Sequence, residues 1–148
     1  MNLLILGDIM GASGRKVLYD KLPELVKKNK IDFVIVNGEN ASDDGRGITQ
    51  EIAEEFFKIG VDVITSGNHI WDKKETIDFI ERENRLLRPA NLVNGSPGKG
   101  YRIYSSKDKK SKIGVINLMG NVFMRKTEDV FKTAKEISNK LKLKKDVD

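Results

Sequence analysis

The residues with the clearest chemical potential are five polar side chains in three short stretches: Asp8, Glu39, Asn40, Asn68 and His69. Carboxylate and amide oxygens are ligands of hard divalent cations, and an imidazole can bind a metal or transfer a proton near neutral pH. The chain contains one histidine and no cysteine. The set therefore suits a divalent metal and a phosphate. The absence of cysteine excludes a zinc site with thiolate ligands.

Short buried strands are expected to position these side chains. Residues 3–6, 32–37 and 61–65 are mainly aliphatic, and a glycine-containing turn follows each run. Amphipathic helices are expected between them, at 15–28 and from Thr49 to Ile59. Alternation of strand and helix predicts a parallel sheet, in which ligands bind beyond the carboxyl ends of the strands. The three polar stretches should therefore form one shared site.

The pattern changes after a third helix, expected at 73–82 with Asp72 as its N-cap. The remaining segments read as a meander and a closing helix: an extended segment at 86–91, strands at 101–104 and 112–118 joined by a turn at 108–110, and an amphipathic helix starting at Thr127 or Asp129. One α/β domain over residues 1–148 is predicted.

Each candidate side chain also has a structural interpretation. Asp8 is expected to bind metal, or to be a carboxylate favoured by a helix dipole. Glu39 is a candidate metal ligand or a turn residue, and Asn40 can bind metal or phosphate or stabilise its turn. Asn68 offers a neutral oxygen ligand. The adjacent His69 is a candidate to stabilise phosphoryl charge or protonate a leaving oxygen, with a structural histidine as the alternative.

Four further residues are weaker candidates. Trp71, the only tryptophan, is expected to pack locally rather than stack on a base. Arg88, Asn91 and Lys99 lie in neighbouring segments and are candidates for phosphate contacts.

Composition narrows the class of protein. The 148 residues are 39% hydrophobic, which is enough for one packed core. No run approaches the roughly 20 apolar residues of a membrane span, and no secretion signal precedes the first strand. We therefore expect a cytoplasmic protein without a membrane partner.

The net charge of +5 is concentrated near the C-terminus. Residues 1–104 carry 15 basic and 16 acidic side chains, whereas residues 105–148 carry 12 and 6. The lysines at 140–145 are not interleaved with aromatic residues, so we interpret them as a solvated helix end. Nucleic acid is expected only as a possible substrate.

Longer strings give these residues a family context. The sequence contains GDIMGASGR, NGENA, GNHIWDKKE, RPAN and PGKG in this order. From Met1 to about Leu118 it resembles the YmdB-like branch of the calcineurin-like metallophosphoesterases, whose members act on cyclic nucleotides. The resemblance implies a four-layer αββα sandwich, of which this chain would form a part with a largely parallel first sheet.

The resemblance also implies chemistry: hydrolysis of phosphodiesters such as 2′,3′-cyclic nucleotides at two divalent metal ions, iron or manganese. Asp8 and Glu39 would be metal ligands, Asn40 and Asn68 metal ligands or phosphate contacts, and His69 would serve the leaving group. A histidine of the wider superfamily is replaced by Met10, as in this branch.

Three histidines that the family carries in a second half are missing. The second metal site is therefore expected to be incomplete and the isolated chain nearly inactive. We expect a truncated domain whose residues 146–148 lead toward another strand, with apolar sheet surface left open to association, for example into homo-oligomers.

Two other functions fit parts of the sequence. A non-catalytic half-domain that binds phosphate or a partner would not need the missing histidines. A nucleotide-binding α/β domain would use the glycines at 7, 11 and 14, but their spacing departs from GxGxxG.

Overall fold

The computed structural model describes all residues from Met1 to Asp148. Its elements are, in order, β1 (Leu3–Leu6), α1 (Gly11–Lys28), β2 (Phe33–Asn37), α2 (Gln50–Lys58), β3 (Val63–Thr65), α3 (Lys74–Arg82), β4 (Leu86–Leu87), β5 (Tyr101–Ser105), β6 (Lys112–Ile116) and α4 (Val130–Lys140). No helix combines the length and the apolar composition needed to cross a membrane.

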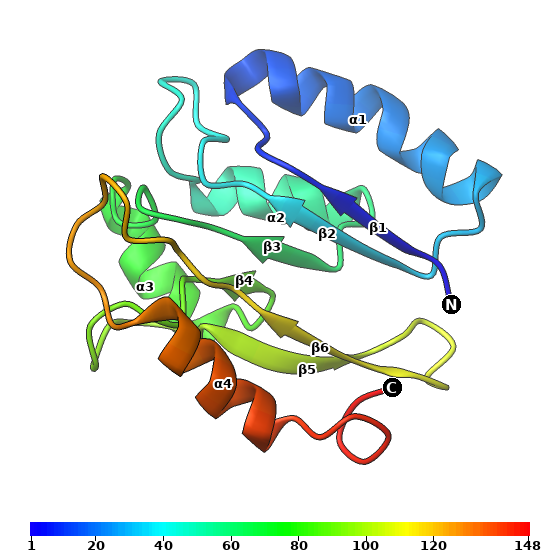
Figure 1. Cartoon of the computed structure of the whole chain (residues 1–148). Coiled ribbons are helices and arrows are strands. Elements are labelled where there is room, and N and C mark those ends of the chain that lie inside the picture. The colour runs from blue at the N-terminus through cyan, green and yellow to red at the C-terminus, as the bar shows by residue number, and fades with distance from the viewer.

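The first sheet is parallel, with the strand order β1-β2-β3-β4, as Figure 1 shows. Leu3 pairs with Phe33, Ile35 with Val63, and Ile64 with Leu86. The two crossovers through α1 and α2 follow the prediction. Helix α1 begins at Gly11, four residues before its predicted start, and the left-handed φ of +56° at that residue suits a glycine.

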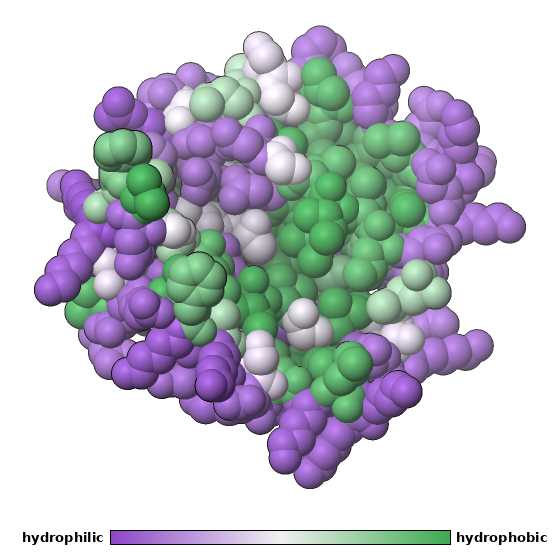
Figure 2. Space-filling model, in the orientation of Figure 1, coloured by the Kyte–Doolittle hydropathy of each residue, from purple (hydrophilic) through white to green (hydrophobic).

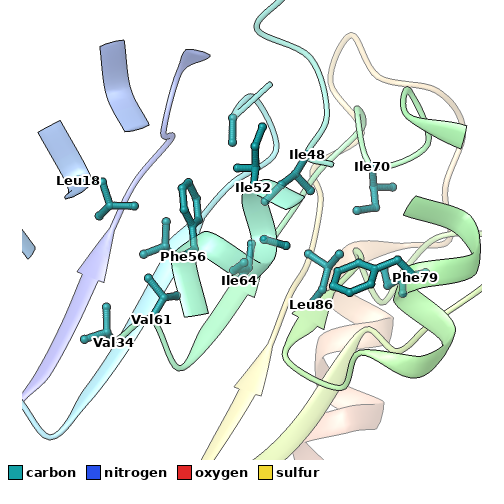
Figure 3. Close-up of a cluster of buried hydrophobic side chains, with 14 of the residues drawn as sticks. Leu18, Val34, Ile48, Ile52, Phe56, Val61, Ile64, Ile70, Phe79 and Leu86 are labelled. Carbon is teal, nitrogen blue, oxygen red and sulfur yellow. The ribbon is translucent and has the colours of Figure 1, made fainter. Parts of the chain in front are cut away.

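One face of this sheet packs against helices and forms the main core. Val34, Val36, Ile64 and Leu86 point to this side, where they meet buried side chains of α1, α2 and α3, including Leu18, Phe56 and Phe79 (Figure 3). The apolar residues of α1, which was predicted to be amphipathic, are only partly buried. Leu18 and Leu22 are in the core, whereas Val17 is 63% exposed.

The opposite face of the first sheet packs partly against a second sheet. This sheet is the antiparallel pair β5-β6, and the predicted hairpin is confirmed. Alternate residues Phe33, Val63 and Leu87 contact Ile113 and Val115 of β6. Because successive side chains of β2 to β4 point to opposite faces of the sheet, these strands contribute to two cores, one on each side.

Part of that opposite face stays open to solvent. Leu3 and Ile5 of β1 are 43% and 69% exposed, although both are aliphatic strand residues. Figure 2 shows a broad hydrophobic area across the middle of this side of the molecule. The expected uncovered sheet surface is therefore present.

The last residues run beside β6. The backbone N–H of Asp148 donates to the carbonyl of Lys112 over 2.9 Å, and Lys112 N donates to the Asp148 carboxylate over 2.6 Å. Helix α4 is capped by Asp129, whose carboxylate accepts from Lys132 N, so Asp129 rather than Thr127 begins this helix.

Candidate active site

Three loops at the carboxyl edge of the first sheet carry the candidate residues. They follow β1, β2 and β3 and are joined by backbone hydrogen bonds: Ile9 N donates to Asn37 O over 3.0 Å, and Gly38 N to Thr65 O over 2.9 Å. The segment after β6 reaches the same edge, where Asn117 Nδ2 donates to the carbonyl of Ser66 over 2.8 Å. The parallel topology therefore gathers these loops as the sequence predicted.

Asp8 and Asn40 are in direct contact. Asn40 Nδ2 donates to Asp8 Oδ1 over 2.8 Å, and the Asn40 carbonyl accepts from Gly11 N over 2.9 Å. Asn40 is buried, whereas Asp8 is exposed. The amide therefore holds the Asp8 carboxylate in place, and its own Oδ1 stays available to a ligand.

Glu39 lies between the loops that follow β1 and β3. Burial raises the pKa of its half-buried carboxyl, the negative charge of Asp8 raises it further, and His69 lowers it. A Cβ at Gly67 would overlap the Glu39 carboxylate, so this side chain reaches across to the loop after β3. Two acidic groups and the imidazole are thus near enough to interact, and a bound cation would relieve the repulsion between the two acids.

His69 is oriented by a neighbour in its own loop. Its Nδ1 lies 2.7 Å from Oδ2 of Asp72. The prediction that Asp72 caps the next helix is wrong: Lys73 occupies the N-cap position of α3, without a side-chain cap. The carboxylate turns back to the imidazole instead, which directs Nε2 away from Asp72 as the nitrogen free for a substrate.

The remaining residues of this loop support it. Trp71 packs against the main core, in agreement with its predicted packing role, while Asn68 is partly exposed beside His69. Ser66 is buried, and its hydroxyl donates to Leu87 O over 2.8 Å. The loop after β3 is therefore anchored on both sides of Asn68 and His69.

The candidate side chains have the chemistry of ligands for a divalent cation, but in this structure they do not converge as ligands of a bound ion would. Asp8, Glu39 and the Asn40 amide supply the oxygen ligands that hard cations prefer. No three acidic or histidine side chains converge closely enough to form a metal site by themselves.

Two residues predicted to reach phosphate are structural. Arg88 donates to three backbone carbonyls, those of Pro89, Ser96 and Pro97. Asn91 is fully buried and holds both ends of the segment after β6. Its Nδ2 donates to the carbonyl of Met119 over 2.7 Å, and its Oδ1 accepts from Met119 N.

Other residues of the site region carried no signal in the sequence. Arg15 of α1 donates to Ala41 O over 2.5 Å and to the Asp43 carboxylate over 2.6 Å. Lys73 contacts both carboxylate oxygens of Asp44, over 2.9 and 2.8 Å. These contacts fix the loop after β2 to its neighbours. Only the tertiary fold brings such distant partners together.

A hollow of about 990 Å³ lies elsewhere, between α4, β5 and the segment at 88–100. Its lining includes none of the five candidate residues. The candidate site therefore lies outside this hollow.

Comparison with known proteins shows the family of the chain. Residues 4–148 match the family described as YmdB-like protein. The chain is 42% identical to the 2′,3′-cyclic-nucleotide 2′-phosphodiesterase of Bacillus subtilis, over 93% of this chain and 51% of that protein. It is 34% identical to a putative phosphatase/phosphodiesterase of Mycoplasma pneumoniae, over 100% of this chain and 52% of that protein.

Solved structures show the same fold. A hypothetical protein from Thermus thermophilus superposes with a TM-score of 0.87 at 32% identity, covering 96% of this chain and 54% of its own. A novel phosphatase from Mycoplasma pneumoniae gives a TM-score of 0.86 at 33% identity, with coverages of 95% and 51%. The chain spans about half the length of the curated relatives it matches. It belongs to the YmdB-like family, whose named members include hydrolases of phosphoesters.

Proposed function

We propose that this chain carries part of the active site of a metal-dependent phosphodiesterase that acts on 2′,3′-cyclic nucleotides. The observation that carries the proposal is the meeting of the Asp8–Asn40 pair, Glu39 and the His69–Asp72 pair at one edge of the sheet. The name of the Bacillus subtilis relative supplies the substrate class. A fold alone would not supply it.

Asp8 and Glu39 would hold the metal ion, and the amides of Asn40 and Asn68 would add oxygen contacts to the ion or to phosphate. Iron or manganese suits a mixed set of oxygen donors and imidazole. A bound divalent ion would supply charge neutralisation for the phosphoryl oxygens and activation of water. A second ion would need ligands beyond those that meet here.

His69 would act as the general acid. In the proposed reaction water adds to phosphorus, the bond between phosphorus and the ribose 2′ oxygen breaks, and that oxygen takes a proton. The Nε2 atom of protonated His69 would donate this proton, while Asp72 holds Nδ1 and stabilises the positive charge. The attacking water would release one proton to solvent as its oxygen bonds to phosphorus. The products would be a nucleoside 3′-phosphate and neutral imidazole, which then takes up a proton from solvent.

The test measures hydrolysis of bis-p-nitrophenyl phosphate and 2′,3′-cyclic AMP with Mn²⁺. Three polypeptides are compared: this chain, a longer product of the same reading frame, and the longer product with His69→Ala. We expect the longer form to be active, the 148-residue chain to be nearly inactive, and His69→Ala to lower kcat on the order of 10²-fold. The matched control is a fourth polypeptide, the longer product with Asn94→Ala, in which the substituted position is exposed and lies outside the site.

Other outcomes would change the proposal. Turnover by the 148-residue chain would mean that its own residues complete the metal site. Absence of hydrolysis, together with phosphate binding, would favour a non-catalytic binding domain, which the lack of a converged ligand cluster also favours. Binding of NAD without metal would favour the nucleotide-binding alternative.

A further inference from the structure

The loop that carries Glu39 also packs against the backbone of His69, at Gly47. This buried residue has a φ of +75°, in the left-handed region. A Cβ built on it would lie 3.0 Å from the His69 carbonyl oxygen and 3.2 Å from Cγ of Lys73. The first of these neighbours is backbone, which cannot rotate away as a flexible side chain does. A side chain at this position therefore requires the His69 backbone to shift by a few tenths of an ångström, in addition to the strain of the left-handed φ.

The same residue is bonded to the other side of the site. Gly47 N donates to the carbonyl of Glu39 over 2.6 Å, and the Gly47 carbonyl accepts from Ser42 N over 3.0 Å. Gly47 thus contacts the backbone of a candidate metal ligand and that of the candidate general acid. Any displacement at this position must be shared between Glu39 and His69.

Two contacts near Gly47 hold the loop after β2 against the segment that follows His69. Lys73 bridges both carboxylate oxygens of Asp44, and the buried Thr76 hydroxyl donates to Ile48 O over 2.6 Å. An ion pair with an exposed partner is weak, so it helps to hold the loops in contact but does not limit how closely they approach. The closest approach that these contacts permit is limited where Gly47 meets the His69 backbone.

We propose that Gly47 is a positioning residue that sets the separation of Glu39 from His69. The proposal rests on the proposed function, because it assigns Gly47 a role only through those two side chains. Gly47→Ala would force the His69 carbonyl outward and turn the imidazole away from Glu39. The change would reach the site without removing any group that touches substrate.

Gly60 provides a matched control. It also has a left-handed φ, +103°, but no atom lies within 4 Å of a Cβ built there. It follows α2 and precedes β3, at the end of the sheet opposite the site. Alanine at either position introduces backbone strain, because both φ values lie in the left-handed region. Only Gly47→Ala adds the contact with His69.

Two residues of the site can report its conformation in spectroscopic measurements. His69 is the only histidine and Trp71 the only tryptophan, so the imidazole proton signals and the tryptophan emission each report one position. Both are measured without metal on the 148-residue chain. We expect Gly47→Ala to shift the two imidazole signals and the emission maximum, and Gly60→Ala to leave them as in the unsubstituted chain.

A second pair of variants covers the case in which Gly47→Ala does not fold. Asp44→Asn weakens the contact between the loops and keeps every glycine, whereas Asp20→Asn removes the exposed Lys16–Asp20 pair of α1. We expect Asp44→Asn to shift the His69 signals in the same direction as Gly47→Ala but less, and Asp20→Asn to leave them unchanged.

Mn²⁺ alone then tests the link to function, because a bound paramagnetic ion broadens nearby proton signals. Half-broadening of the His69 signals should need on the order of 10-fold more Mn²⁺ in Gly47→Ala than in Gly60→Ala. The positioning role is overturned if each test variant shifts the reporters no more than its control. If Mn²⁺ fails to broaden the unsubstituted chain, the metal proposal fails, and the metal-free reporters still decide the role of Gly47.

Discussion

His69 Nδ1 lies 2.7 Å from Oδ2 of Asp72, three residues further along the same loop. The pair joins the only imidazole of the chain to a carboxylate that does not cap the helix it precedes. A carboxylate in this position selects the tautomer and stabilises the protonated ring. Both members of the pair lie in the loop after β3.

Removing Asp72 should therefore impair proton transfer more than binding. In the catalytically active polypeptide, Asp72→Ala is expected to lower kcat for 2′,3′-cyclic AMP on the order of 10- to 10²-fold with little change in KM. Steady-state kinetics with Mn²⁺ measure both constants. Asp78→Ala, at an exposed position of α3, is the control. An unchanged kcat in Asp72→Ala would remove His69–Asp72 from the proposed mechanism.

Glu39 should make stability depend on pH. Burial and Asp8 raise the pKa of its carboxyl in the folded chain. Between the unfolded and folded pKa values the folded chain binds more protons, so its stability falls as pH rises through that window. Glu39→Gln removes this cost, and its free energy of unfolding relative to the unsubstituted chain should be higher at about pH 7 than at about pH 4.

Guanidinium denaturation at the two pH values measures this difference. Glu24→Gln, at an exposed position of α1, should show none. Mn²⁺ should stabilise the unsubstituted chain more than Glu39→Gln, because a ligand that binds only the folded state adds to stability. An equal effect of Glu39→Gln at both pH values would contradict the assigned environment of this carboxyl.

Asn91 should contribute to the stability of the fold and not to phosphate binding. Asn91→Ala would leave the buried carbonyl and N–H of Met119 without their side-chain partner. Loss of these bonds should lower the free energy of unfolding by about 2–4 kcal/mol. Asn94→Ala should change it by less than about 0.5 kcal/mol. A stable Asn91→Ala chain with weakened phosphate binding would restore the predicted ligand role.

The open face of β1 should drive association. Ile5→Lys replaces a side chain that is 69% exposed, so the fold should lose less than about 0.5 kcal/mol. Binding of the dye ANS and self-association in sedimentation should both decrease. Val17→Lys, on α1, replaces a side chain of similar exposure outside this surface. Equal effects of the two substitutions would mean that general hydrophobicity, and not the sheet face, causes association.

Local patterns were sufficient for the strands, their parallel order and the grouping of the site loops. Runs such as Val34–Val36 can only be buried, and a parallel sheet places all their carboxyl ends at one edge. Asp8, Glu39 and His69 could thus be placed in one site without knowledge of any contact.

The roles of several single residues could not be obtained in this way. Asp72 has a sequence position typical of an N-cap, and Arg88 and Asn91 have the chemistry of phosphate ligands. Their actual partners are an imidazole and backbone carbonyls. Short-range propensity competes here with hydrogen bonds that exist only after the chain has folded.

The sequence by itself determined the α/β class, the three site loops and the type of ligand they offer, because these follow from residue chemistry and hydrophobic period. Only the tertiary structure decided that Gly47 lies against the His69 carbonyl, and that Lys73 meets Asp44. The partners in these contacts are 22 to 29 residues apart. Which atoms meet at such distances depends on how the loops pack, and local sequence does not encode that packing.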